Sequence, residues 1–526
     1  IGQNALKVQN FTTATDSFNT AVGFEAGAAV TTGIRNTIMG GLAGDALTDA
    51  DLNVVMGYNA LSSDTLGSGS IAIGQGTLHT QNFTTATTTN NVAVGYNTGG
   101  AVTTGIQNTL IGGGAGDALT DADFNVAIGY NALSSDTLGS RSTAIGRSAL
   151  TTQNFTTATD TGNVAVGFNA GVAVTTGTNN VLIGTEAGDS ITSGNTNVAV
   201  GTLALATNQQ GDRNTAVGYK ALEDMNPSGN VDTYNTAVGF FAGTAVTTGV
   251  QNTLIGGLAG DALTDADFNV AVGYAALTAD TLGSRSVAIG QSALGTQNFT
   301  TATDVYNVGV GMNAGAAVTT GKENTLIGGL AGDAITDGFA NVAVGKGSLS
   351  TEDRGAKTTA IGFEALTNQN AGTGATYNTA VGSSAGAALT TGLENTFIGG
   401  EAGDALTDAD FNVAVGRNAL GADTLGSRST AIGFQALNTQ NFTTATDSNN
   451  TAVGANAGLA VTTAIQNVLL ASRAGESITT GSFNVAVGHL AGAHSVDLTT
   501  GTRNTLLGSY VHTSAADSNN QIVMGH

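Results

Sequence analysis

The chain has no cysteine and no tryptophan, and its single proline is Pro227. Without thiols it can form neither disulfides nor thiolate zinc sites, and it has no cysteine nucleophile. Charged residues make up 10% of the 526 residues, which is too few for a disordered polyelectrolyte. No apolar run approaches the roughly 20 residues of a membrane-spanning helix. These shortages predict a folded, soluble chain.

Basic residues are also scarce, because 15 Lys and Arg stand against 38 Asp and Glu, for a net charge of −23. Nucleic acids and anionic membranes both require a basic face on their partner, so the charge balance disfavours binding to nucleic acid and insertion into membranes. A strongly acidic, cysteine-free, glycine-rich chain is typical of durable proteins outside the cell. We therefore expect an extracellular or virion-surface location.

Glycine is abundant, at 77 residues against a usual share of about 7%. Internal repetition explains this abundance of glycine, because a five-residue phrase of the type Asn-Thr-Ala-Val-Gly recurs along the whole chain. The closing glycines Gly23, Gly40, Gly57 and Gly74 follow one another at intervals of 17 residues (40 − 23 = 17), and Gly95 follows after 21 residues (95 − 74 = 21). This cycle of four intervals recurs along the chain, and later cycles differ from it by one residue. We expect one continuous repeat domain over residues 1–526. Because Ile1-Gly2 is the end of a phrase, we also expect a fragment of a longer chain.

A period of about 17 residues is too short for a helical pair and suits one coil of a β-solenoid. The phrase has β-branched residues at its second and fourth positions, as in Val126 and Ile128, and turn-forming Asn and Gly at its ends. The predicted fold is all-β: a parallel β-solenoid, or β-roll, of about 29 coils without helices. Every fourth coil is expected to be longer, with roughly 20–21 residues. A second, weaker strand is expected in the middle of each coil, for example at 29–32 and 46–48.

The third position of the phrase is apolar as well, as at Leu110. Successive side chains of a strand point to opposite faces, so the third position lies on the face opposite to the second and fourth. If one face of the solenoid were exposed to solvent, the third position should be polar. Two apolar faces indicate that one fills the coil and the other packs against identical copies, which predicts a homo-oligomer. The asparagines are expected to form a ladder from coil to coil. The residues assigned structural roles are Asn19, Asn36, Asn53, Asn91, Gly23, Gly40, Gly57, Gly95, Leu110, Val126 and Ile128.

The phrase at 19–23, followed by Ala26 and alternating with Val-Thr-Thr-Gly at 30–33, resembles the head repeat of YadA-like trimeric autotransporter adhesins. It resembles the repeat of phage tail-fibre shafts, which has the same period, more closely, and the resemblance covers the whole chain. It implies a left-handed parallel β-roll homotrimer with the glycine-ended strand near the three-fold axis. Adhesin head coils are generally shorter and lack the extension in every fourth coil, which favours a fibre shaft over an adhesin head.

Repeated acidic turns are candidate calcium sites, because an Asp-x-Asp turn supplies hard oxygen ligands. The alternative, which we favour, is a solvated turn with side-chain to backbone hydrogen bonds. No other metal or cofactor is expected. The pairs are Asp49 and Asp51, Asp121 and Asp123, Asp265 and Asp267, and Asp408 and Asp410.

The longer coils carry the sequence Gln-Asn-Phe-Thr-Thr-Ala-Thr, whose phenylalanine is a candidate platform for a repetitive glycan. We favour the alternative that these rings plug the wider coil or cover the neighbouring protomer, because each stands alone in a threonine-rich segment. They are Phe11, Phe83, Phe155, Phe299 and Phe442.

No catalytic constellation is expected, because an active site rarely recurs in identical surroundings along a chain. The sequence predicts a non-enzymatic fibre shaft or adhesin stalk that presents a receptor-binding tip. Its partners would be copies of itself and, through regions outside this chain, a host cell-surface glycan or receptor. A self-assembling extracellular filament and a repetitive glycan-binding surface are the alternatives.

Overall fold

The computed structural model describes residues 1–525. It is all-β, a parallel β-solenoid of about thirty turns whose strands recur at the spacing of the phrase. The described residues contain no helix, and hence none that is long and apolar enough to cross a membrane. The chain divides into two compact units, Ile1–Ala266 and Asp267–His526. Each unit is described by itself.

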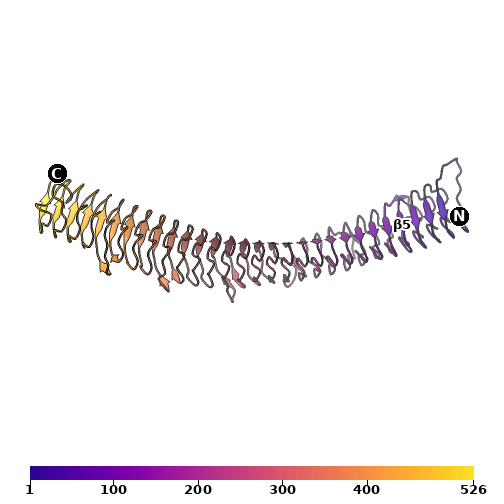
Figure 1. Cartoon of the computed structure of the whole chain (residues 1–526). Helices are drawn as coiled ribbons and strands as arrows, with labels where there is room; N and C mark the ends of the chain where they lie inside the picture. Colours follow the sequence, from indigo (N-terminus) through magenta and orange to yellow (C-terminus); the bar gives the residue numbers. More distant parts are fainter. Residues whose placement is uncertain (526) are drawn as a thin grey trace. The chain divides into compact units, whose positions relative to one another are not determined.

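In the first unit, the recurring phrase forms three-residue strands that follow one another in a row (Figure 1). These strands are β1 (Thr20–Val22), β2 (Thr37–Met39), β3 (Val54–Met56), β5 (Ile71–Ile73), β7 (Val92–Val94), β8 (Thr109–Ile111), β9 (Val126–Ile128), β11 (Thr143–Ile145), β13 (Val164–Val166), β14 (Val181–Ile183), β15 (Val198–Val200), β17 (Thr215–Val217), β19 (Thr236–Val238) and β20 (Thr253–Ile255). Two-residue strands pair as β4 (Gly67–Ser68) with β6 (Thr87–Thr88), β10 (Gly139–Ser140) with β12 (Thr159–Asp160), and β16 (Gly211–Asp212) with β18 (Val231–Asp232).

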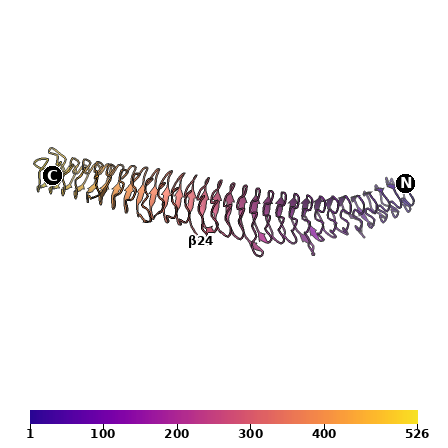
Figure 2. The same ribbon diagram turned by 60° about the horizontal axis from the view of Figure 1, so that its bottom comes forward.

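The second unit repeats this organisation. Its three-residue strands are β21 (Val270–Val272), β23 (Val287–Ile289), β25 (Val308–Val310), β26 (Thr325–Ile327), β27 (Val342–Val344), β29 (Thr359–Ile361), β31 (Thr379–Val381), β32 (Thr396–Ile398), β33 (Val413–Val415), β35 (Thr430–Ile432), β37 (Thr451–Val453), β38 (Val468–Leu470), β39 (Val485–Val487), β40 (Thr505–Leu507) and β41 (Ile522–Met524). The two-residue strands pair as β22 (Gly283–Ser284) with β24 (Thr303–Asp304), β28 (Gly355–Ala356) with β30 (Gly374–Ala375), and β34 (Gly426–Ser427) with β36 (Thr446–Asp447). The longer coil that carries β24 projects from the stack (Figure 2).

Neighbouring strands are parallel and in register, so equivalent positions of successive coils stack in columns. Thr20 pairs with Thr37 across an ordinary coil, and Ile71 pairs with Val92 across a longer one. The extra residues leave the pairing intact because they form the projecting segment of that coil. The third position of each phrase points inward, and Leu110 there is fully buried.

The closing glycine of the phrase is required by both conformation and space. Gly40 has a φ of +137°, a region that side chains with a Cβ rarely adopt. A Cβ at Gly40 would lie 2.4 Å from the carbonyl oxygen of Gly57 in the next coil. Ala471 occupies the equivalent place with a φ of 115°, so its backbone is strained. The opening asparagine does not take up a positive φ, and the residue before it does, as at Arg35 with a φ of 59°.

Asparagine side chains run as a ladder inside the coils. The Asn36 Nδ2 donates to the Ala50 carbonyl oxygen at 2.8 Å, and the Asn36 Oδ1 accepts from the Asn53 backbone N–H at 2.9 Å. Asn36 and Asn53 are fully buried. Each buried amide is therefore satisfied by the neighbouring turns, as burial of a polar group demands.

The prediction of a second strand in the middle of every coil is wrong. Residues 29–32 and 46–48 form turns and bends, and the two-residue strands occur only beside the longer coils. The Thr31 N–H and the Gly33 N–H both donate to the Thr48 carbonyl oxygen, at 2.9 and 3.2 Å. Because two donors converge on one acceptor, the segment curves instead of continuing as an extended ladder.

Candidate functional site: an outward apolar face

Four residues of each coil lie on the outer side of the strand segment. Counting the asparagine of the phrase as position 1, they occupy positions 0, 2, 4 and 6, and we call the stacked sets column 0, column 2, column 4 and column 6. In the coil that ends at Gly129 they are Phe124, Val126, Ile128 and Tyr130. The two aromatic side chains are 44% and 60% exposed, and the two aliphatic side chains are half-buried.

The apolar character of this face recurs along both units. Many aliphatic side chains of column 4 are 36–41% exposed, namely Met39, Met56, Ile111, Ile183, Val238 and Ile255 in the first unit and Ile289, Ile327, Ile361, Ile398, Ile432 and Val453 in the second. Column 6 adds aromatic rings that are 40–67% exposed, namely Phe24, Tyr58, Tyr96, Tyr130, Phe168, Tyr219, Phe240, Tyr274, Phe363 and Phe434. Exposed apolar surface of this kind makes the face a candidate interaction site.

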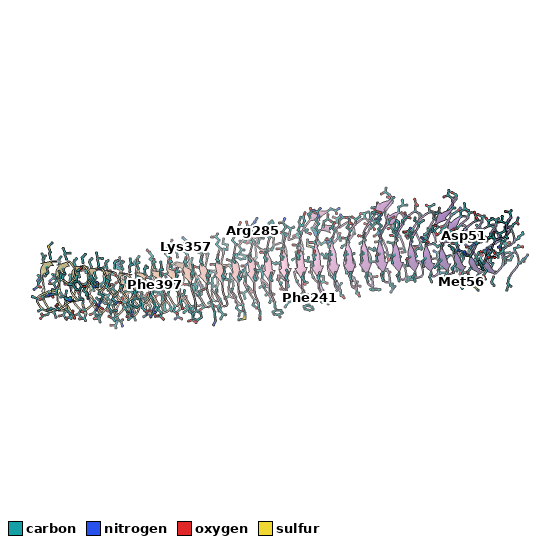
Figure 3. The ribbon with its side chains drawn as sticks, turned by 90° about the horizontal axis from the view of Figure 1, so that it is seen from above. Asp51, Met56, Phe241, Arg285, Lys357 and Phe397 are labelled. Atoms are coloured by element: carbon teal, nitrogen blue, oxygen red, sulfur yellow. The ribbon has the colours of Figure 1, made fainter. Side chains whose placement is uncertain are left out.

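Column 0 carries stacked cations and aromatic rings that the sequence analysis missed. The Arg285 guanidinium lies 4.7 Å from the Phe268 ring centroid and 5.9 Å from the Tyr306 ring centroid, and its Nε is 2.9 Å from the Asp304 carboxylate. Arg285 and Lys357 project from the same edge of the second unit (Figure 3). These pairs are exposed and contribute little stability. In the sequence, these side chains could have been found by comparing the residues that directly precede each phrase.

Equivalent pairs occur elsewhere in column 0. Arg141 lies 5.6 Å from the Phe124 ring centroid and its Nε is 3.1 Å from the Asp160 carboxylate. Arg428 lies 4.9 Å from the Phe411 ring centroid and its Nε is 3.1 Å from the Asp447 carboxylate. The acidic partners come from the projecting longer coils, so column 0 lies at the side of the face next to these projections.

The candidate calcium residues act as acceptors between successive coils. The Asp49 Oδ1 accepts from the Thr32 hydroxyl at 2.5 Å, and the Asp51 Oδ1 accepts from the Ile34 N–H at 2.8 Å. The same bonds recur at Asp121 and Asp123 and at Asp408 and Asp410, and the Asp265 Oδ1 accepts from the Thr248 hydroxyl; the Asp267 N–H donates to the Ser284 hydroxyl. Residues 1–525 contain no cluster of three or more metal-ligating side chains. The geometry thus gives these carboxylates a hydrogen-bonding role between coils.

The phenylalanines of the longer coils are covered by other residues of the chain. Phe83, Phe155, Phe299 and Phe442 are 6–8% exposed, and Phe11 is half-buried. A ring this buried has no open face on which a sugar can stack. These side chains fill the wider coils.

A polar cluster is buried beside four of these rings, namely Phe83, Phe155, Phe299 and Phe442. The Gln81 Nε2 donates to the Asp64 Oδ2 at 2.6 Å and to the Ser70 hydroxyl at 3.0 Å, and the Gln81 Oε1 accepts from the Asn91 Nδ2 at 2.9 Å. The Asp64 Oδ1 accepts from the backbone N–H groups of Gly67 and Phe83, each at 3.1 Å. Burial raises the pKa of the Asp64 carboxyl. With all its members satisfied, the cluster pins the longer coil to the coils on either side.

A second set of carboxylates is half-buried and less well satisfied. Burial raises the pKa of Asp189 to about 6, and the neighbouring Glu186 charge contributes to the rise. The Asp189 Oδ1 has no hydrogen-bond partner among the described residues. Asp45, Asp117, Asp333 and Asp404 share the unpartnered oxygen and the raised pKa, and burial is the main cause in each. They lie on separate coils, so they form no common site.

No protein-family model matches the chain, and a search of curated proteins finds no match. The geometry of the outward face therefore carries the functional argument.

Proposed function

We propose that this chain is a non-catalytic structural segment of an extracellular or virion-surface fibre, a shaft or stalk that holds a receptor-binding tip away from its base. The observation that carries the proposal is the outward apolar face formed by columns 2, 4 and 6 in both units. A lone chain leaves aromatic side chains such as Tyr96 67% exposed, which is unfavourable unless another surface covers them.

The proposed cover is the same face of identical chains that lie parallel around a common axis. A closed rotation brings one copy's face onto the next and leaves the acidic turns outside. The net charge of −23 on each chain then opposes lateral association of finished fibres. We further propose the left-handed, three-chain form with a super-repeat of four coils. The resemblance to tail-fibre shafts and YadA-like heads supports three chains and the hand, and the spacing of the glycines supports the super-repeat.

The proposed function is mechanical. Each coil is hydrogen-bonded to its neighbours through backbone and asparagine side chains, so local opening requires several bonds to break together. Burial of the apolar face between copies removes the remaining exposed sheet surface, which is otherwise prone to uncontrolled association. Such an assembly is stiff and resistant to proteases.

Sedimentation equilibrium and velocity on the purified chain test the proposal. One chain has a mass of 51.7 kDa, and we expect a single species of three times that mass with a high frictional ratio. A mass that grows without limit would indicate the alternative, an end-to-end filament. A monomer at micromolar concentration would refute the assembly and with it the proposed function.

A further inference from the structure

One coil in each cycle of the repeat has an unusual outward face. These coils end at Gly40, Gly112, Gly184, Gly256, Gly328, Gly399 and Ala471. In column 0 they all carry an exposed polar residue, namely Arg35, Gln107, Asn179, Gln251, Glu323, Glu394 and Gln466. In column 6 they all carry a small residue, namely Gly41, Gly113, Thr185, Gly257, Gly329, Gly400 and Ser472. A polar side chain at one side of the face thus accompanies a short one at the other.

The chain itself does not require glycine in column 6 of these coils. Gly113 lies outside the left-handed region, and a Cβ there would meet its nearest atom, on Tyr130, at an ordinary 3.7 Å. Gly41, Gly329 and Gly400 are equally unconstrained, with nearest atoms at 3.6, 4.0 and 3.9 Å. Most other coils place a larger residue in this column, such as Tyr, Phe, Arg or Lys. No contact within the single chain therefore accounts for the glycine at these positions.

In the coil that ends at Gly112, Gly113 leaves a notch between two rings. Tyr96 and Tyr130 occupy column 6 of the coils before and after Gly113, and they are 67% and 60% exposed. Strands stack about 4.8 Å apart, so these two coils are about 9.6 Å apart at this point. The Tyr130 ring borders this gap, because its Cδ2 would lie 3.7 Å from a Cβ at Gly113.

The polar side chain of the same coil cannot reach its own notch. Gln107 and Gly113 are six residues apart and lie on either side of the three-residue strand β8, which corresponds to roughly 15–20 Å. The Gln107 side chain also makes no hydrogen bond within the described chain. When parallel copies rotate about a common axis, column 0 of one copy meets column 6 of the next at the same level.

We propose that, in these coils, the column 0 side chain of one copy inserts into the column 6 notch of the same coil of the neighbouring copy. The inference rests on the proposed assembly of parallel copies and adds its axial register. Columns 2 and 4 repeat almost unchanged from coil to coil, so a slip by one coil would cost them little. The same slip would place Gln107 against Tyr96 or Tyr130 of the neighbouring copy instead of Gly113. The polar side chains therefore determine the axial register between neighbouring copies.

The coil that ends at Gly146 is the only one with cations in both columns, at Arg141 and Arg147. The pairing would bring these two side chains together. Asp160 compensates Arg141 there, with its carboxylate 3.1 Å from the Arg141 Nε.

Cysteine cross-linking tests the pairing, because the natural chain contains no cysteine. In the double variant Gln107→Cys/Gly113→Cys, the two cysteines of one chain cannot form a disulfide with each other. Their separation along the strand is far larger than the roughly 4.4–6.8 Å between Cα atoms that a disulfide needs. After oxidation, non-reducing electrophoresis in SDS should show a covalent species of three chains. Glu394→Cys/Gly400→Cys gives an independent reading in the second unit.

Three controls give the result its meaning. Each single variant, and the mismatched pair Gln107→Cys/Gly41→Cys, should remain at the mass of one chain. Each variant is also examined by sedimentation, which reports assembly separately from cross-linking. Assembled protein that forms no disulfide in either matched pair, or that links equally in the mismatched pair or through Gln107→Cys alone, would overturn the pairing and leave the proposed function standing. Loss of assembly in the natural chain would instead refute the proposed function.

Discussion

Replacing Ala471 by glycine should stabilise the second unit. Ala471 stands where the other coils have the closing glycine, and it has a φ of 115°. Its N–H still donates to the Val453 carbonyl oxygen at 2.8 Å, the same length as the Gly40 to Val22 bond. The hydrogen bond is therefore kept, although the φ of Ala471 lies below the 127–147° of the closing glycines, and the alanine carries the strain.

The magnitude follows from two opposing effects. A residue in such a sparsely populated conformation costs about 1–3 kcal/mol. Glycine has a more flexible unfolded state, which offsets about 0.4–1 kcal/mol of the relief. The net gain should be about 1 kcal/mol in the free energy of local unfolding around β38 and β39.

Hydrogen exchange measured by mass spectrometry is the suitable assay, because a long repeat array need not unfold in a single step. A gain of about 1 kcal/mol slows exchange in these two strands roughly fivefold. Gly454→Ala is the matched control, since its Cβ would lie 2.4 Å from the Ala471 carbonyl carbon and should speed exchange. Unchanged or faster exchange in Ala471→Gly would refute the strain argument.

Two further predictions concern the faces of the coil and the half-buried carboxylates. Leu110→Asp places an unpaired charge in the fully buried interior and should cost at least about 4 kcal/mol, whereas Val126→Asp should leave each chain folded but dissociate the assembly. Circular dichroism and sedimentation distinguish these outcomes, and a Val126→Asp chain that assembles normally would contradict the interface. Because the pKa of Asp189 is about 6 in the folded chain and 3.8 in its ordinary state, the folded form binds the proton more tightly, so stability should rise as the pH falls from 7 towards 4.5. Asp189→Asn should be more stable than the natural chain at pH 7, and its stability should rise less as the pH falls. Thermal melts of both proteins at each pH measure this difference, and an unchanged pH profile in the variant would show that Asp189 titrates normally.

The sequence alone determined the position of the main strands. The period of the phrase places them, because a strand that must pair with its copy in the next coil repeats at a constant spacing, as Thr20 and Thr37 do. The closing glycine was readable for the same reason, since its close approach to the next coil recurs at Gly40 and Gly57. The absence of helix followed from the lack of any sustained helical period in the apolar residues.

The tertiary structure decided the features that depend on contacts between coils. Asp64, Gln81 and Asn91 are far apart in the chain, and only stacking brings their side chains within hydrogen-bonding distance. The turn at 29–32 has the residue types of a strand, but its donors converge on Thr48 in the next coil.

The outward face shows the same division. The alternation of apolar residues could be read from the phrase, but which face the chain covers could not. The structure places Leu110 inside and leaves Val126 and Tyr130 outside, because only one side of a three-residue strand can face the narrow interior of the coil.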